Sequence, residues 1–475
     1  MTKYNIVIGL EIHAELDTRT KAFCSCRNEF GSLPNTQVCP VCLGLPGALP
    51  RLNKKAVEYT IMGGLSFGCD INKRAIFERK NYFYPDLSKS YQITQLSTPL
   101  CIGGGITLST GKYIKFNRIH LEEDAGKLIH NRETNETLID FNRCGIPLIE
   151  MVTNPEIMTV DEVVEFLTKL KKTLIYSGIA KCKAEEGGIR FDLNISVSKQ
   201  GSDELGTRCE INNLSSMKDI KNAIEYESAR HIKQLEEGRA VLRETRVWCE
   251  EKGETIVLRE KEMENEYRYF PDPDIIPIEI SDNDIKTLKA RIPEVLDGRK
   301  LKLTSLGLKE ADAEILLGNK DLLDLFMATL SILNEPEAIA HWIIQELLYR
   351  LRQNIGVSVK ELITADNLAQ IIKYELSGEI TRINARTLLD VVIATGKDAD
   401  SLVKELDLSG EVNKKDIVDI VGMLINENPD IVKDYKNSPK EVINFFMGNI
   451  MKNTHGKARP EYIEPLIIEI LKKYN

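Results

Sequence analysis

The chain has 475 residues, of which 42% are hydrophobic and 28% are charged, as in globular proteins. Its formal net charge of −9 excludes a protein that coats nucleic acid by bulk electrostatics, but not a local basic patch. No apolar run approaches the roughly 18–20 residues of a membrane span, and no signal or transit peptide is visible, so we expect a cytoplasmic protein without a membrane partner.

Residues 6–16, IVIGLEIHAEL, predict the first strand. Hydrophobic side chains occupy the even positions, whereas Glu11, His13 and Glu15 occupy odd positions. This alternation predicts a strand with one face in a core and the other face in contact with water. An ordinary solvated face would carry Thr, Lys, Ser or Gln, so the carboxylates and the imidazole indicate a functional surface. Glu15, at the end of the strand, also fits a simply solvated position.

Four cysteines follow in the spacing C-x-C-x12-C-x2-C, namely Cys24, Cys26, Cys39 and Cys42. Two close pairs of thiolates at the tips of turns are typical of a structural, tetrahedral Zn²⁺ site. We therefore expect a zinc knuckle over residues 24–42. Buried or redox-active thiols are the alternative, and the spacing favours zinc. The remaining cysteines are scattered singly, which predicts core packing for them.

Segment 77–95, FERKNYFYPDLSKSYQITQ, combines cations, aromatic rings and directional hydrogen-bonding groups. This mixture suits a nucleotide base and its phosphates, or the stacked end of an RNA. An aromatic-rich loop that closes a core explains the same composition equally well. Segment 265–277, NEYRYFPDPDIIP, resembles it and carries the same ambiguity.

Three later segments repeat the alternation of the first strand: RIHLEED (118–124), IRFDLNIS (189–196) and TRCEINN (207–213). Their polar positions carry Glu, Asp, Asn, His and Arg, including His120 and Arg190, and Glu150 follows an apolar PLI. One such strand is usually a solvated face, but four in one domain predict a concave functional surface. Clustered carboxylates with an imidazole suit Mg²⁺ or Mn²⁺, and nearby arginines suit a phosphoryl group.

Two helices are predicted among these strands. Residues 159–178 carry a capping box of Thr159 and Glu162 at their start and a glycine at their end. Residues 216–238 begin at the capping residue Ser216 and also end at a glycine.

The composition changes near residue 290. Residues 1–290 predict one α+β domain built on a large, mostly antiparallel sheet, with the zinc ribbon as an insertion. Residues 291–406 have helical periodicity nearly throughout and predict an all-helical domain, whereas 407–475 predict a small helical tail domain.

Nucleotide-binding and hydrolase signatures of common folds are missing from the sequence. It contains no Walker A motif, no GxGxxG after a strand, no HExxH and no GxSxG, so any ATP chemistry would use a site without a P-loop. The tail segment GNIMKNTHGKARPE carries a basic run that fits phosphate contacts. Basic helix ends are, however, common on any protein surface.

The chain resembles the GatB family, the B subunits of bacterial aspartyl/glutamyl-tRNA amidotransferases. The resemblance spans essentially the whole chain and is carried by GLEIHAEL, FCSCRNEFG, PNTQVCPVCLGLPGALPRLN, ERKNYFYPDL, YQITQ, IHLEEDAGK, DFNRCGIPLIEMV, RCEINNLSS, ETR, EYRYFPDPD and GNIMKNTHGKARPE.

This resemblance implies a cradle-shaped catalytic domain, a helical domain and a tail that grips tRNA. It also implies an ATP-dependent carbon–nitrogen ligase, in which ATP phosphorylates the side-chain carboxylate of Glu-tRNA(Gln) or Asp-tRNA(Asn). Ammonia then attacks the acyl phosphate. The ammonia would come from glutamine hydrolysed by a separate amidase subunit, and a small third subunit would complete a heterotrimer.

Carried over onto this sequence, the resemblance implies catalytic roles for His13, Glu11, Glu122, Glu123, Glu150, Asp192 and Glu210. The residues expected to hold Mg²⁺ are His13, Glu11, Glu123, Glu150 and Glu210. Those expected to bind the nucleotide or the acyl end are Lys80, Asn81, Tyr82, Tyr84, Asp86, Gln92 and Arg208. The tRNA would contact Lys452, His455, Lys457 and Arg459.

Some positions depart from the family pattern. Ser90 and Val247 replace glycines, and Glu260 replaces a serine, whereas the acidic and histidine positions are retained. We therefore expect an active enzyme, and a divergent second copy with altered tRNA preference is one hypothesis for the changes. Two other classes of function stay open: a tRNA-binding module without catalysis, and a metal hydrolase that uses Glu-x-His and needs no ATP.

Overall fold

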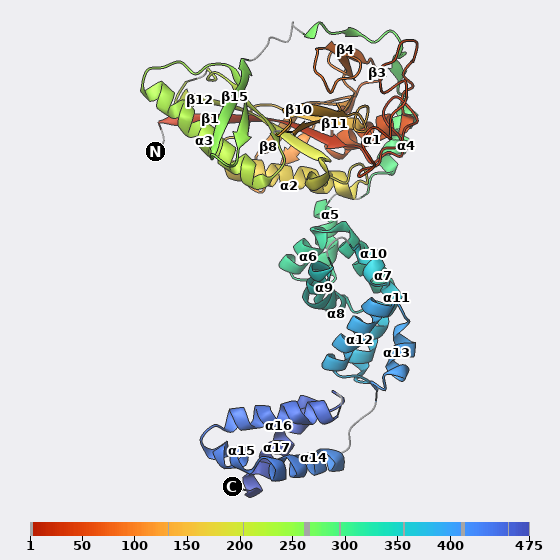
Figure 1. Ribbon diagram of the computed structural model, residues 1–475, viewed down its shortest axis with the longest axis vertical. Coiled ribbons are helices and arrows are strands. Elements are labelled where there is room, and N and C mark those ends of the chain that lie inside the picture. Colours follow the sequence, from red (N-terminus) through yellow and green to blue (C-terminus); the bar gives the residue numbers. More distant parts are fainter. Residues whose placement is uncertain are drawn as a thin grey trace. The chain divides into compact units, whose positions relative to one another are not determined.

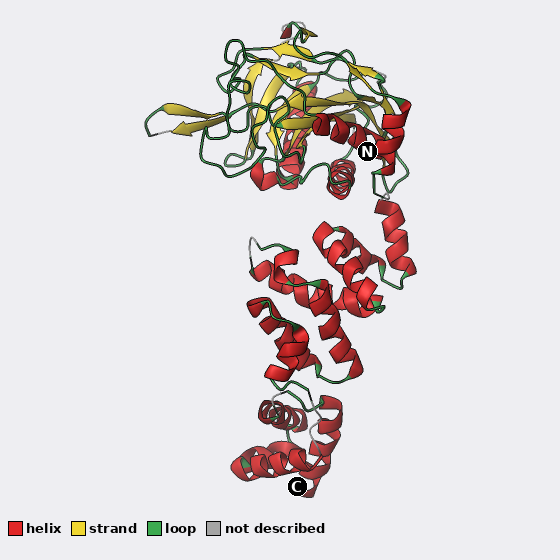
Figure 2. Ribbon diagram, turned by 90° about the vertical axis from the view of Figure 1, so that its right-hand side faces the viewer, coloured by secondary structure: helices red, strands yellow, loops and turns green. Residues whose placement is uncertain are grey.

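The structure is a computed structural model that describes residues 3–131, 133–202, 204–260, 267–293, 296–354, 357–409, 414–454 and 456–474. It divides into two compact units, Met1–Leu296 and Asp297–Asn475 (Figures 1 and 2). The first unit combines strands and helices, and the described part of the second unit is helical. The α+β class with a helical C-terminal region is confirmed. The predicted boundary near residue 406 stays a prediction.

A mixed sheet of ten strands organises the first unit (Figure 1). Its order is β15 (Glu254–Glu260), β14 (Glu244–Cys249), β13 (Cys209–Leu214), β12 (Ile189–Lys199), β1 (Tyr4–Glu15), β11 (Pro147–Thr153), β8 (Tyr113–Glu123), β6 (Cys101–Ile102) and β2 (Asp70–Ile71), with β7 (Gly105–Thr107) beside β8. Among the described pairs, β13 and β14 are parallel and the others antiparallel. The parallel pair follows from the long crossover through helix α3 (Met217–Glu236).

Three smaller sheets accompany the large one. They are β10 (Glu136–Asp140) with β9 (Lys127–Asn131), β16 (Phe270–Pro271) with β4 (Glu78–Asn81) and β5 (Tyr91–Thr94), and β17 (Ile278–Glu279) with β3 (Arg74–Ala75). The β9–β10 hairpin projects from the body of the unit (Figure 2). The helices of this unit are α1 (Lys54–Ser66), α2 (Val160–Tyr176), the 3-10 turn η1 (Ala184–Glu186), α3 and α4 (Asp282–Ala290).

Strand β1 shows the predicted alternation. Leu10, Ile12 and Ala14 are buried in a core that α1, α2 and α3 complete from the same side of the sheet. Burying each leucine or isoleucine contributes about 1.5–3 kcal/mol. The opposite face of β1 carries Glu11 and His13, which are half-buried. The helices therefore cover one face of the sheet and leave the polar face for the site.

The two predicted helices form with their predicted starts. The Thr159 hydroxyl accepts a hydrogen bond from the Glu162 amide at the start of α2, but the Glu162 carboxylate binds Lys112, so half of the expected capping box forms. Ser216 caps α3 in the same way, through the amide of Asp219.

The second unit consists of α5 (Leu296–Ser305), α6 (Glu310–Leu317), α7 (Lys320–Ile332), α8 (Pro336–His341), the π-helical turn η3 (Trp342–Leu347), α9 (Leu348–Gln353), α10 (Val359–Leu362), α11 (Ala365–Ser377), α12 (Arg382–Thr395), α13 (Ala399–Glu405), α14 (Lys414–Glu427), α15 (Pro429–Lys433), the 3-10 turn η4 (Asp434–Lys436), α16 (Pro439–Asn453) and α17 (Pro460–Tyr474). Helices α14, α16 and α17 share an apolar core of their own. Within the described ranges, no helix has the length and hydrophobicity needed to cross a membrane.

A buried ion network joins α3 to the outer strands of the large sheet. The fully buried Glu227 accepts hydrogen bonds from Arg230 and from the Thr255 hydroxyl, the latter at 2.7 Å. Arg246 donates to Thr255 at 2.8 Å and to Glu244 at 2.6 Å. Two carboxylates and two guanidinium groups therefore balance each other inside the protein. Burial alone would raise the pKa of Glu227, but the nearby His231 ring, whose Nε2 is 3.2 Å from Glu227 Oε1, and hydrogen bonds from Arg230 and Thr255 hold it well below its ordinary value.

We expect Glu227→Gln to lower the free energy of unfolding by about 3–5 kcal/mol at neutral pH, because it leaves buried arginine charge uncompensated. A carboxyl with a depressed pKa stabilises the fold above its unfolded pKa, and this contribution is lost as the pH falls. The difference between wild type and variant, measured by urea denaturation, should therefore shrink below about pH 4.5. Glu250→Gln, at an exposed pair with Lys218, is the control and should leave the midpoint unchanged. A difference that stays constant down to pH 3 would contradict the assignment.

Candidate functional site

The polar face of the large sheet lines a cavity of about 450 Å³. Its carboxylates are Glu11, Glu122, Asp124, Glu150, Asp192 and Glu210. Its cations are Lys80, Arg118, Arg190, Arg208 and Arg243. Two histidines, His13 and His120, and three tyrosines, Tyr82, Tyr267 and Tyr269, also line it. All predicted catalytic residues except Glu123 therefore lie around one space.

Strand register brings these side chains together. His120 on β8 lies opposite Glu150 on β11, Glu150 lies opposite His13 on β1, and His13 lies opposite Arg190 on β12. Side chains two positions apart share a face, so Glu11 and Asp192 form the neighbouring row. A shift of one residue in the register of any of these strand pairs would turn the polar side chains into the core. The hydrophobic face of the sheet therefore determines the register that forms the site.

His13 lies between three carboxylates. Its Nε2 atom is 3.5 Å from Glu122 Oε1 and 3.5 Å from Glu150 Oε2, and its Nδ1 atom is 3.9 Å from Asp192 Oδ2. Single donor atoms of His13, Glu122 and Glu150 lie within 4.8 Å of one another, as ligands of one metal ion do. Two carboxylates and one imidazole suit a hard divalent cation that keeps positions open for phosphate oxygens.

The same proximity changes how these groups titrate. Burial favours the neutral ring of His13, but the carboxylates of Glu150, Glu122 and Asp192 outweigh it and raise the pKa of His13 to about 10. Burial and the neighbouring Glu150 raise the pKa of Glu122 to about 8. At neutral pH, His13 and Glu122 therefore carry protons. These protons supply the positive charge that a divalent cation would supply if one were bound.

Four of the predicted nucleotide-binding residues, Lys80, Tyr82, Gln92 and Arg208, line this cavity. The Lys80 ammonium is 4.9 Å from the ring centre of Tyr267, which also lines the cavity. The aromatic segments 77–95 and 265–277 therefore contribute to the same wall. This observation favours the binding interpretation over that of a loop that only closes a core.

Three other predicted nucleotide-binding residues lie outside the lining. Asn81 donates a hydrogen bond of 2.8 Å to the carbonyl of Arg268 and so ties the two aromatic segments together. The Tyr84 side chain is 52% exposed. Asp86 is half-buried, and its carbonyl accepts a hydrogen bond from the Gly126 amide.

Glu123 faces away from the cavity, because it follows Glu122 directly on a strand whose side chains alternate. Its two carboxylate oxygens accept hydrogen bonds of 2.6 and 2.7 Å from Lys89, and one of them also accepts the Ile93 amide at 3.0 Å. A small cavity separates this ion pair from Cys24 and Cys42.

The four predicted cysteine ligands form a second group. Their sulfur atoms lie within 4.8 Å of one another, and Cys39 Sγ is 3.9 Å from Cys42 Sγ. Tetrahedral Zn²⁺ with Zn–S bonds of about 2.3 Å requires a sulfur separation of about 3.8 Å, so this group fits zinc. A hydrogen bond from Cys24 and the charge of the fully buried Lys21 lower the pKa of Cys42 to about 4, whereas the hydrogen bond with Cys42 and burial raise the pKa of Cys24. Cys42 is therefore the thiolate of this group.

A third group, Cys209, Glu227 and His231, also has a metal-ligand composition. Its carboxylate is already bonded by Arg230 and by the Thr255 hydroxyl. Arg230 and Arg246 compensate the buried charge, so we assign this group to the ion network of the fold.

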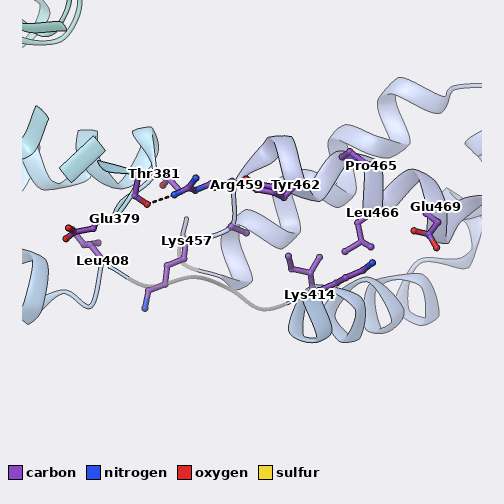
Figure 3. Close-up of a pocket in the computed structure, with 13 residues that line it drawn as sticks. Glu379, Thr381, Leu408, Lys414, Lys457, Arg459, Tyr462, Pro465, Leu466 and Glu469 are labelled. Atoms are coloured by element: carbon purple, nitrogen blue, oxygen red, sulfur yellow. Dashed lines mark hydrogen bonds between the residues drawn. The ribbon is translucent and has the colours of Figure 1, made fainter. Parts of the chain in front are cut away.

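Of the described residues predicted to contact tRNA, one is exposed and two are bonded to other residues of this chain. Lys452 is exposed on α16, and His455 lies outside the described residues. Lys457 Nζ is 2.6 Å from Asp407 Oδ2, and the Arg459 guanidinium donates to the carbonyl of Gly378. Lys457 and Arg459 line a cavity of about 580 Å³ within the second unit (Figure 3). Both cations therefore contact their own chain.

Comparison with known proteins decides the family. The family model described as the GatB/GatE catalytic domain matches residues 6–286, and that described as the GatB domain matches residues 324–471. The chain is 43% identical over 479 residues to the aspartyl/glutamyl-tRNA(Asn/Gln) amidotransferase B subunit of Caldicellulosiruptor saccharolyticus (strain ATCC 43494 / DSM 8903 / Tp8T 6331), covering 99% of this chain and 100% of that protein. The chain belongs to the GatB family. The protein of the same name from Thermoanaerobacter pseudethanolicus (strain ATCC 33223 / 39E) is 43% identical over 476 residues, with 99% and 100% coverage.

Several cavity residues of this GatB family member have no role assigned from sequence. Alternation places His120 and Arg190 on polar faces, but alternation gives no role. Tyr267 and Arg243 reach the cavity from segments that carry no periodic signal. Ser90, where the family usually has glycine, adopts a φ of 60°, the left-handed conformation that glycine favours.

We expect Mn²⁺, a spectroscopic substitute for Mg²⁺, to bind the His13 cluster more tightly as the pH rises from about 6 to 9. His13 and Glu122 have raised pKa values, so a cation must displace their protons below those values. Electron paramagnetic resonance titrations at several pH values, with zinc supplied to the cysteines, measure the effect. In His13→Gln the pH dependence should be shallower, and a wild-type affinity independent of pH would contradict this assignment.

Proposed function

We propose that this chain uses ATP to phosphorylate the side-chain carboxylate of Glu-tRNA(Gln), Asp-tRNA(Asn) or both, and that ammonia then converts the acyl phosphate to the amide. The products would be Gln-tRNA(Gln) and Asn-tRNA(Asn). The observation that carries this proposal is the cluster of His13, Glu122 and Glu150 beside Lys80 and Arg208 in one cavity. The names of the related proteins, which are aspartyl/glutamyl-tRNA amidotransferase subunits, support it.

In this proposal, Mg²⁺ held by the His13 cluster would neutralise phosphate oxygens and orient them for transfer. Glu11 and Asp192 are held ready beside the cluster, because Asn194 donates to Glu11 at 3.0 Å and the Asn213 amide donates to Asp192 at 2.7 Å. We assign Glu210, on the next strand, to the same acidic wall.

Cations in the lining of the cavity would stabilise the negative charge of the transferring group. Lys80 and Arg208 line the cavity and are placed for this role. Lys80 is half-buried, whereas Arg208 is exposed. Tyr82 and Gln92 line the cavity beside them and suit contacts with a base or an ester carbonyl. Glu123, bonded to Lys89, would act by positioning the end of β8.

The ammonia would come from glutamine, hydrolysed by a separate amidase subunit, with a small third subunit completing a heterotrimer in the cytoplasm. The relatives are named as one subunit of an amidotransferase, which supports a multi-subunit enzyme. We propose residues 1–290 as the catalytic cradle with structural Zn²⁺ on Cys24, Cys26, Cys39 and Cys42, residues 291–406 as the helical domain, and 407–475 as the tRNA-binding tail.

The test is an amidation assay on the complex co-purified with untagged partners, using both misacylated tRNAs with and without ATP. His13→Ala or Glu210→Ala should reduce ATP-dependent amidation by about a hundredfold or more, because each removes a group from the proposed phosphoryl site. Ammonia release from glutamine by the partner should persist.

The matched control is Glu15→Gln, on the same strand and face as His13 but outside the lining of the cavity. This variant should keep full amidation. Failure of the wild-type complex on both tRNAs in the presence of ATP would contradict the proposed reaction. Full activity of His13→Ala would indicate a binding module, and activity without ATP would indicate a hydrolase.

A separate prediction concerns the tail. Lys452→Ala should weaken tRNA binding and reduce the slope of log affinity against log salt by about 1, as loss of one phosphate contact does. Lys457→Ala should leave this slope unchanged, because Asp407 already neutralises that ammonium. Filter binding of labelled tRNA over a salt series measures both slopes. Equal slopes in the wild type and Lys452→Ala would place the tRNA contact elsewhere.

A further inference from the structure

His120 is a buried histidine at the edge of the acidic cluster. Its side chain is 2% exposed. It lies on β8 opposite Glu150 on β11, and Glu150 lies opposite His13 on β1. One carboxylate is thus flanked by two imidazoles across three adjacent strands.

The polar contacts of His120 lead to both carboxylates of the cluster. His120 Nε2 is 3.4 Å from Glu150 Oε2 and 3.1 Å from Thr94 Oγ1. Thr94 Oγ1 is in turn 3.4 Å from Glu122 Oε2. The Thr94 hydroxyl donates its only hydrogen to Glu122, so it accepts from His120 and Nε2 carries the hydrogen.

The other ring nitrogen of His120 serves no structural bond. Nδ1 is buried and has no hydrogen-bond partner among the described residues. An unpartnered buried polar atom destabilises the fold, so Nδ1 adds nothing to the stability of the protein. The polar contacts of His120 therefore all serve Glu122 and Glu150, directly or through Thr94.

We propose that His120 is a positioning residue: its Nε2–H group, together with the Thr94 hydroxyl, turns the carboxylates of Glu150 and Glu122 toward His13. This inference rests on the proposed function, in which those carboxylates hold the cation. Outer groups of this kind orient metal ligands in many proteins. Without His120, Glu150 can rotate toward Arg118, whose Nη2 atom is 3.8 Å from the other carboxylate oxygen.

A matched pair of variants isolates the Nε2–H group. The side-chain nitrogen of His120→Gln reaches about as far from the backbone as Nε2, whereas that of His120→Asn reaches only as far as Nδ1. Both variants are polar amides, so a purely structural role would affect them alike. Mn²⁺ affinity is measured by electron paramagnetic resonance on the complete complex, with zinc content and thermal midpoint recorded beside it.

We expect His120→Asn to weaken Mn²⁺ binding by about 10–100-fold, the range seen when a partner of a metal ligand is removed. His120→Gln should stay within about threefold of wild type. In amidation assays, His120→Asn should require more Mg²⁺ and recover much of its rate at saturating Mg²⁺. Equal affinities in both variants, or an equal loss in both, would overturn the positioning role.

A further variant separates this proposal from the proposed function. Glu150→Gln should abolish tight Mn²⁺ binding whatever His120 does. If the wild-type complex binds no Mn²⁺ in the cavity, or Glu150→Gln binds it as wild type does, the cation site and the role of His120 both fail. If Glu150→Gln loses binding while His120→Asn keeps it, the cation site stands and the role of His120 is refuted.

Discussion

The register of four antiparallel strands is the constraint on which the site depends. In the order β8, β11, β1 and β12, it places His120, Glu150, His13 and Arg190 in one row. The opposite face of the same strands packs against α1, α2 and α3, and a shift of one residue would expose that core. The hydrophobic interior therefore specifies the polar site on the other face of the same strands.

Burial of so many charges in one cavity is tolerated because they compensate one another. His13 takes up a proton between Glu122, Glu150 and Asp192, and the pKa of Glu122 rises because Glu150 lies beside it. Removing water strengthens each of these interactions. In the proposed function, a divalent cation would supply in one atom the positive charge that the protons now provide.

The sequence predicted the faces of strands better than the contacts between segments. Alternation is a local signal, so it identified His13, Glu122 and Asp192 before any pairing was known. The same signal could have excluded Glu123 from the cavity, since its neighbour Glu122 faces it. Tyr267 lies in segment 265–277, whose composition predicted either a binding site or a loop that closes a core. Arg243 reaches the site from an irregular segment, and the bonds of Lys457 and Arg459 to Asp407 and Gly378 depend on tertiary packing, so no local pattern shows them.

The two adjacent glutamates at the end of β8 also explain why the group of four cysteines lies so close to the cavity. Glu122 faces the cavity, whereas Glu123 binds Lys89. The residue before Lys89, Ser88, donates a hydrogen bond of 2.6 Å to the carbonyl of Cys42. The cysteine group is therefore joined to the acidic cluster through one short stretch of backbone and one ion pair. Because side chains alternate along β8, Glu122 and Glu123 point to opposite faces of the strand. The end of β8 therefore contacts the cavity on one face and the segment next to the cysteine group on the other.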